Sequence, residues 1–182
     1  HFFKLTNYNK TNNHLFEVAA DRGYFSAKMV SNHITVNLPK KTVAIDTTFD
    51  TGPRSRFGRT TFSKTPLNVK FLNKFLNYHI GQYYNSRHVQ ETQNNLNNTN
   101  YFSQVIINPV INKKSTTTPI DIKLAMNKRR QYLFGLGYGT DTGVRGTIGM
   151  KYNWLNQWGH YGEINAQGSW VNYNVVAGYH MP

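Results

Sequence analysis

The chain has 182 residues, enough for one ordinary domain or two small ones. It carries 21 Lys and Arg against 8 Asp and Glu, and the formal net charge of +13 indicates an anionic partner: nucleic acid, phospholipid headgroups or lipopolysaccharide. The absence of cysteine excludes disulfides and thiolate metal sites, the aromatic content of 14% excludes a disordered basic tail, and no apolar run approaches the roughly 18 residues of a transmembrane helix. Because the chain starts at His1 and not at Met, we expect it to be a piece of a longer polypeptide.

The first 52 residues predict a helix followed by a hairpin. Asn9 to Arg22 form the helix, and Gly23 follows it, a residue type that tolerates the left-handed backbone of helix ends. Tyr24 to Asn37 and Thr42 to Phe49 form the two strands of the hairpin. We interpret residues 1–52 as the C-terminal part of an α+β module.

Residues 53–127 predict one complete module of the order β-α-α-β-β. The strand Ser55 to Phe62 opens it, and the strands Tyr101 to Ile111 and Pro119 to Met126 close it. Between them, two segments place residues at helical spacing on one face, the first after Pro66 and the second with Asn85 or Ser86 as a helix N-cap candidate. The residues on these faces are Leu67, Phe71, Leu72, Phe75 and Leu76 in the first helix, and Val89, Gln93 and Leu96 in the second.

The two modules show an internal repeat at an offset of 77 residues. Tyr24-Phe25-Ser26 recurs as Tyr101-Phe102-Ser103, and Val43 to Asp46 falls on Ile120 to Lys123. Phe57-Gly58 falls on Phe134-Gly135 in the same register. A repeated module explains the three matches, and a chance alignment of aromatic-rich strands is the alternative. At the exit of the second helix Asn100 stands where the first copy has Gly23, and it also tolerates the left-handed conformation.

After residue 128 the periodicity changes from 3.6 to two. In the first segment Tyr132, Phe134, Leu136 and Tyr138 share one face, and Gly135, Gly137 and Gly139 share the other. These glycines therefore belong to a strand and do not form a dinucleotide-binding loop, which needs a strand and then a helix around G-x-G-x-x-G. Three further segments of about ten residues alternate in the same way, with apolar faces made by Val144, Ile148, Met150, Tyr152 and Trp154, by Ile164, Ala166 and Trp170, and by Val171, Tyr173, Val175, Ala177, Tyr179 and Met181.

Four such segments joined by short turns predict the strands of a transmembrane β-barrel, each about 9–11 residues long. The opposite face carries Arg145, Lys151 and Glu163 with many amides, as a wet lumen does. Tyr152, Trp154 and Trp158 gather at one turn, where membrane-interface aromatics are expected. A soluble β-meander that packs its apolar face on helices is the alternative.

No constellation of catalytic or metal-binding residues is recognisable. The seven histidines are scattered without the spacing of metal ligands, and there is no G-x-S-x-G nucleophile elbow. Asp141 is best interpreted as a turn residue. We therefore predict no enzyme activity, no catalytic residue, no metal and no cofactor.

Several motifs carry a resemblance to a known family. They are Arg22-Gly23-Tyr24-Phe25, Arg56-Phe57-Gly58, Asn100-Tyr101-Phe102-Ser103, the segment from Gly137 to Arg145 (GYGTDTGVR), and Tyr179-His180-Met181-Pro182. Together they resemble the outer-membrane assembly proteins of the BamA/TamA type, with the TamA branch as the nearer match. The resemblance implies that residues 1–52 and 53–127 are POTRA-like modules and that residues 128–182 are the first four strands of a barrel. Because family barrels have many more strands, it also implies a fragment.

The family implies a bacterial outer-membrane location with periplasmic N-terminal modules, and a role in assembly and translocation of outer-membrane proteins. The implied partners are unfolded outer-membrane proteins, a TamB-like inner-membrane-anchored protein and outer-membrane lipids. A client strand would pair with the first barrel strand at Tyr132, Phe134, Gly135, Leu136, Gly137, Tyr138 and Gly139, and Arg56, Phe57 and Gly58 would form a module edge. The alternative function is a basic, aromatic nucleic-acid-binding module, which the spread of the basic residues and the lack of a binding motif disfavour.

Overall fold

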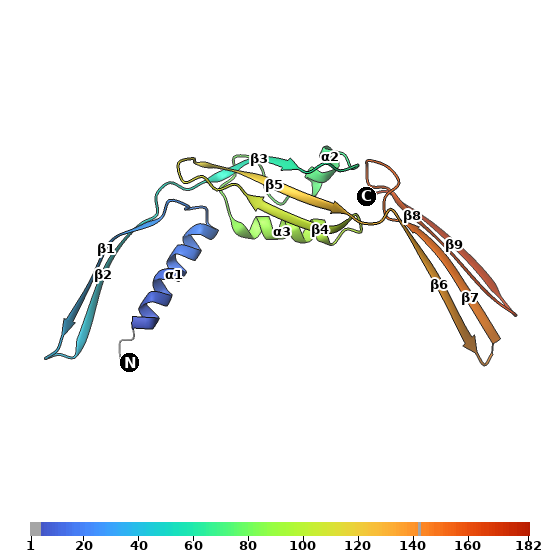
Figure 1. Cartoon of the computed structure of the whole chain (residues 1–182), viewed down its shortest axis with the longest axis horizontal. Helices are drawn as coiled ribbons and strands as arrows, with labels where there is room; N and C mark the ends of the chain where they lie inside the picture. The colour runs from blue at the N-terminus through green and yellow to red at the C-terminus, as the bar shows by residue number, and fades with distance from the viewer. Residues whose placement is uncertain (1–4, 142) are drawn as a thin grey trace. The chain divides into compact units, whose positions relative to one another are not determined.

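The computed structural model describes residues 5–141 and 143–182, so Thr142 of the predicted turn at 140–143 lies outside the described residues. The fold is mixed α+β and consists mostly of strands (Figure 1). Its elements in chain order are α1 (Leu5–Asp21), β1 (Lys28–Asn37), β2 (Thr42–Asp50), β3 (Arg56–Phe62), α2 (Val69–Leu72), the 3₁₀ turn η1 (Asn73–Phe75), α3 (Ser86–Asn97), β4 (Phe102–Pro109), β5 (Thr117–Met126), β6 (Arg130–Gly139), β7 (Gly143–Tyr152), β8 (Tyr161–Ser169) and β9 (Tyr173–His180).

The chain divides into two compact units. The first comprises residues 1–61, 77–92 and 107–121, and the second comprises residues 62–76, 93–106 and 122–182. The strands form three sheets, with the orders β1-β2, β3-β5-β4 and β6-β7-β8-β9. The division runs through α3 and β5, so the three domains that the sequence predicts stay a prediction.

In the first unit, α1 and the β1-β2 hairpin correspond to the predicted helix and hairpin, but α1 begins at Leu5 and not at Asn9, and β1 begins at Lys28 and not at Tyr24. The strands pair antiparallel from Lys28 opposite Asp50 to Asn37 opposite Thr42, with a bulge after Met29. Gly23 ends the helix with a φ of +87°, the left-handed conformation expected there. A side chain at this position would also collide with Tyr84, because a Cβ would lie 2.8 Å from the Tyr84 Cβ.

The core of the first unit consists of aromatic and β-branched side chains. Phe57 is fully buried, stacks on the Tyr78 ring at 4.1 Å between centroids, and lies 5.0 Å from the Tyr84 ring. Ile120 from β5 is also fully buried. At the buried start of β3, the hydroxyls of Ser55 and Thr118 hydrogen-bond at 2.7 Å, which satisfies both polar groups.

In the second unit the segment after Pro66 is less helical than its spacing predicts. The α-helix covers only Val69–Leu72 and passes into η1. The reason is local, because the Asn68 side chain accepts a hydrogen bond from the Lys70 N–H and so caps the helix two residues beyond Pro66. The apolar face is nevertheless correct, since Leu67, Phe71 and Leu72 are buried.

Asn100 does not adopt the left-handed conformation that its residue type tolerates. Among the residues that the structure describes, Lys41 is the one non-glycine residue with a positive φ, so Asn100 is not left-handed. The end of α3 is closed by Thr99 instead: its N–H and its hydroxyl both donate to the Leu96 carbonyl, at 3.1 and 2.6 Å. A side chain that satisfies an orphan carbonyl removes the need for a left-handed cap.

The 77-residue repeat has a counterpart in the order of elements. At that offset α1 falls on α3, β1 on β4, β2 on β5 and β3 on β6. Helix, hairpin and following strand therefore recur as a set.

Candidate strand-pairing sheet and its anchoring turn

The sheet β6-β7-β8-β9 carries the predicted client-pairing strand. It is antiparallel throughout and in continuous register, for example along the row in which Phe134, Ile148, Ala166 and Val175 are neighbours. Because side chains alternate between faces, the four residues of a row lie on the same side of the sheet. The next row consists of Leu136, Gly146, Gly168 and Tyr173.

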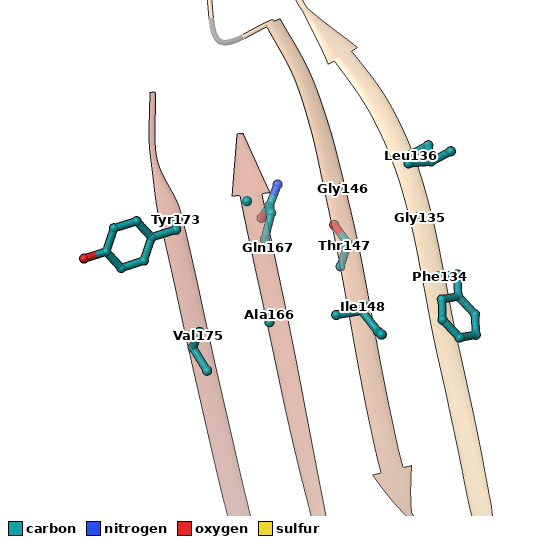
Figure 2. A pocket seen from close by; sticks show the side chains of 11 residues that line it. Phe134, Gly135, Leu136, Gly146, Thr147, Ile148, Ala166, Gln167, Tyr173 and Val175 are labelled. Carbon is teal, nitrogen blue, oxygen red and sulfur yellow. The ribbon is translucent and has the colours of Figure 1, made fainter. Parts of the chain in front are cut away.

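One face of this sheet is apolar and exposed. Leu136 is 92% exposed, and Phe134, Tyr138, Tyr173 and Val175 are exposed too. An open hollow of about 790 Å³ lies on it, and Figure 2 shows Gly146 without a side chain beside Leu136. Gly168 is the next residue of the same row, between Gly146 and Tyr173. Exposed apolar area of this extent marks a surface that another apolar phase or molecule covers.

The opposite face is polar, and its glycines differ in how closely they are packed. A Cβ on Gly135 would lie 3.5 Å from the Thr147 Cβ, an ordinary contact. A Cβ on Gly137 would lie 3.3 Å from the Arg145 Cγ, so that Arg145 lies across Gly137. At Gly149 a Cβ would meet the Asn165 Oδ1, the end of a flexible side chain that would have to move, and would lie 3.3 Å from the Leu133 Cβ. The sequence pattern does not separate these three cases.

All seven predicted client-pairing residues lie on β6, an outer strand of its sheet. In the part of the chain that the structure describes, β6 pairs with β7 on one side and with no strand on the other. Such an edge presents backbone N–H and C=O groups that a further strand can pair with. Leu133 on β6 and Val176 on β9 lie on the otherwise polar face, two apolar exceptions that the alternation does not predict.

The other predicted edge, at Arg56, Phe57 and Gly58, lies on β3, an outer strand of its own sheet. Its start is already covered: the Phe57 N–H donates to the Gln82 carbonyl, and the Phe57 carbonyl accepts from the Gly81 N–H, both at 2.8 Å. The Arg56 guanidinium donates to the Gly81 carbonyl and stacks over the Tyr83 ring at 3.9 Å. A further strand at this point would have to displace residues 81–83.

The predicted interface aromatics surround the turn between β7 and β8. Tyr152 and Trp154 are half-buried beneath the guanidinium groups of Arg130 and Arg129, at 5.2 and 4.7 Å from the ring centroids. Trp158 is exposed. Among the described residues the Trp154 Nε1 has no hydrogen-bond partner although it is buried.

The turn at residues 155–160 is anchored in the second unit by contacts that the sequence does not reveal. The Tyr101 hydroxyl donates a 2.6 Å hydrogen bond to the Gly159 carbonyl, and the Asn68 N–H donates to the Gln157 carbonyl at 2.8 Å. Gly159 has a φ of +74°, and a Cβ there would lie 2.4 Å from the Phe71 ring. The turn is therefore fixed to the N-terminal end of α2 at Asn68 and to Tyr101, which precedes β4.

Burial at this anchor changes the acidity of Tyr101. Removal from water, with a smaller contribution from the nearby Tyr161, raises the pKa of the Tyr101 hydroxyl to about 12. The group stays protonated at ordinary pH and remains a donor to the Gly159 carbonyl. The one sequence signal for the anchor is the glycine after Asn156-Gln157-Trp158, which is typical of a turn with positive φ.

No helix within residues 5–141 and 143–182 is both long and apolar enough to span a membrane. Nor do three or more His, Asp or Glu side chains of that part of the chain gather into a group that could hold a metal ion.

No family model matches the sequence. Solved structures do resemble it: BamA from Haemophilus ducreyi lacking POTRA domains 1–3 matches with a TM-score of 0.74 and 21% identity over 97% of this chain. CdiB from Escherichia coli matches with a TM-score of 0.60 and 12% identity over 99%, and CdiB from Acinetobacter baumannii with 0.57 and 15% over 96%. The matches cover 34%, 34% and 32% of those chains, so this chain spans about a third of their length. The chain shares the fold of the matched third of these BamA and CdiB structures.

Proposed function

We propose that the chain is the periplasmic and first-strand portion of a bacterial outer-membrane protein assembly and translocation factor, of the TamA branch. In this proposal residues 1–52 and 53–127 are POTRA-like modules, and β6 to β9 open a β-barrel. The fold shared with BamA and CdiB supports the family, and the GYGTDTGVR segment supports the branch. The activity belongs to the whole protein, of which this chain is a part.

The observation that carries the proposal is the two-faced sheet. Its apolar face is too exposed to be stable against water over four strands, whereas acyl chains cover such a face at low cost. Its polar face suits a wet lumen. Tyr152, Trp154 and Trp158 would then lie at the periplasmic membrane interface, where aromatic residues with one polar group are favoured.

The proposed mechanism is strand addition at β6. An extended client segment pairs with the open backbone edge of β6, so the main chain supplies affinity without regard to client sequence. Gly135 makes no close contact that demands a glycine, which supports a role in loosening this strand. Gly137 is better explained by steric fit beneath Arg145.

The modules offer further edges on β3 and β4, the outer strands of their sheet. At β3 the covered start at Phe57 restricts the proposal to the remainder of the strand. A TamB-like partner and outer-membrane lipids complete the proposed set of partners. The high positive charge is compatible with the anionic lipids of such a membrane.

Crosslinking tests the strand-pairing proposal directly. The chain has no cysteine, so Leu136→Cys introduces a single reactive thiol into β6. In cells that make the protein and a stalled client with its own cysteine, we expect adducts at this position. Ile148→Cys is the matched control, because it lies on the same face of β7, which is paired on both sides. Equal adduct yields at the two positions, or none at Leu136→Cys, contradict the proposal.

A further inference from the structure

A second hollow, of about 610 Å³, lies in the first unit and is lined mainly by polar residues. It has no part in the strand-pairing proposal. Its wall is formed by the end of α1, the segment before β3 and the first turn of α3. Three arginines, Arg22, Arg54 and Arg87, come one from each of these segments.

Arg54 is held in place within this hollow. Its Nε donates to the Arg22 carbonyl at 2.8 Å and its Nη2 to the Tyr84 carbonyl at 3.4 Å. Its guanidinium also stacks over the Tyr83 ring at 4.7 Å. A guanidinium fixed in this way loses little entropy when it binds a ligand, and it keeps N–H donors that these contacts do not use.

Carboxylates of the described residues do not neutralise the positive charge of the three arginines in this hollow. None of the three arginines forms an ion pair with a carboxylate among residues 5–141 and 143–182. The lining contains one acidic residue, Asp21, so three positive charges stand against one negative charge. This leaves a net charge of +2 at one concave surface, where an anion is attracted more strongly than on a flat one.

We propose that this hollow binds a phosphate monoester or a related phosphate-bearing group. A phosphate monoester carries a charge of about −1.5 to −2 at pH 7, which matches the net charge of the lining. Its three terminal oxygens accept hydrogen bonds from several directions, and arginines from three segments supply donors from several directions. A single carboxylate offers one negative charge and a planar pair of oxygens, and so matches the site less well.

The phosphate could belong to a lipid headgroup or be free in solution, and calorimetry with two probes distinguishes these sources. The intact chain is titrated in a non-ionic, phosphate-free detergent with inorganic phosphate and, separately, with glycerol 3-phosphate. Binding of glycerol 3-phosphate several-fold tighter than phosphate shows that the site recognises the glycerol ester that lipid headgroups carry, and equal binding shows that it recognises the phosphate alone. Either result supports the site.

The variant that tests the site is Arg87→Gln. No hydrogen bond of the Arg87 side chain is found among the described residues, so its loss should leave the fold intact; circular dichroism checks this. Removing one charge-assisted contact should weaken binding about tenfold or more. Arg59→Gln is the matched control, an exposed arginine outside the hollow, and should weaken it less than about twofold in physiological salt.

Asp21→Asn should have the opposite effect to Arg87→Gln. It removes the one acidic group of the lining and should therefore tighten the binding of both phosphate and glycerol 3-phosphate. The proposal is overturned if neither phosphate compound binds, or if Arg87→Gln and Arg59→Gln weaken binding equally. It is also overturned if an acidic peptide binds at the hollow while both phosphate compounds fail to bind.

Discussion

The α+β part of the chain and the sheet β6-β7-β8-β9 use the same apolar residue types in opposite ways. In the α+β part Phe57, Leu72, Leu96 and Ile120 are fully buried. In the sheet Phe134, Leu136, Val175 and comparable residues are exposed. Hydrophobicity alone therefore does not tell a protein core from a surface made for another environment. Nor does a period of two, since β5 also alternates, with Ile120 buried and Lys123 exposed. The difference lies in what covers the apolar face, which only the coordinates show.

The largest expected effect separates the two regions with one substitution in each. Ile120→Ala removes a fully buried side chain and should lower the free energy of unfolding by about 2 to 5 kcal/mol. Ile148→Ala removes the same atoms from a side chain that is 57% exposed and should cost less than about 1 kcal/mol in detergent. Urea unfolding followed by fluorescence measures both. Equal losses would show that the apolar face of the sheet is packed against protein.

The second prediction concerns Gly159, a buried residue in the turn between β7 and β8. Gly159→Ala places a Cβ against the Phe71 ring and forces an L side chain to adopt a φ of +74°, so we expect a loss of about 3 kcal/mol. Gly81→Ala is the matched control: its φ is +86°, but nothing lies within 4 Å of the added Cβ. Its loss should be near 1 kcal/mol, the backbone part alone. Similar losses for both variants would remove the steric role of Gly159.

The sequence predicts the features of this fold that have a local pattern and misses those that depend on contacts between distant residues. The four strands of the sheet lie close to the predicted positions, because a period of two with a polar opposite face is a local signal. The anchor between Tyr101 and Gly159 joins residues 58 positions apart, and no local pattern records it. Likewise Thr99 closes α3 through its own side chain, which overrides the turn preference of Asn100.

For the candidate site, the sequence predicts which residues lie on β6 but not how free their edges and faces are. The glycines at 135, 137 and 149 look alike in sequence and differ in their contacts across the strand. At β3 the cover over Phe57 comes from residues 81–83, a loop whose position depends on tertiary structure. Such contacts require coordinates, because they depend on which segments the fold brings together.

The third prediction tests the anchor by chemistry. Tyr101→Phe leaves the Gly159 carbonyl without its 2.6 Å partner and should cost about 1 to 2 kcal/mol at neutral pH. The raised pKa of Tyr101 adds a pH dependence. The pKa of this hydroxyl is 10.0 when it is exposed to water and about 12 in the folded state, so between these pH values the folded state keeps the proton and the unfolded state loses it. The contribution of Tyr101 to stability is therefore full below pH 10 and falls as the pH rises toward 12.

Unfolding at pH 9 and pH 11 measures this dependence. The wild type should lose stability between the two pH values, and Tyr101→Phe should lose less. Burial raises the pKa of Tyr78 and Tyr84 as well, so part of the loss remains in the variant. An identical loss in both proteins would mean that Tyr101 is not desolvated by the fold.

The smallest expected effect on stability lies at β6. Gly135→Ala adds a methyl group at an ordinary 3.5 Å contact, so stability should change by less than about 0.5 kcal/mol. If the glycine loosens the strand, the crosslinking yield of Leu136→Cys to the client should fall in this background. A yield that stays the same would assign Gly135 to the curvature of the sheet and not to its opening.

We propose that the sheet β6-β7-β8-β9 turns its apolar face to lipid and its polar face to water. Because the chain has no cysteine, single cysteines at Phe134, Ile148 and Val175 on the apolar face, and at Thr147 and Gln167 on the polar face, can be labelled in native membranes with a water-soluble maleimide. We expect labelling that alternates with a period of two, with the polar-face positions modified and the apolar-face positions protected. Equal labelling of the two faces in folded protein would contradict it.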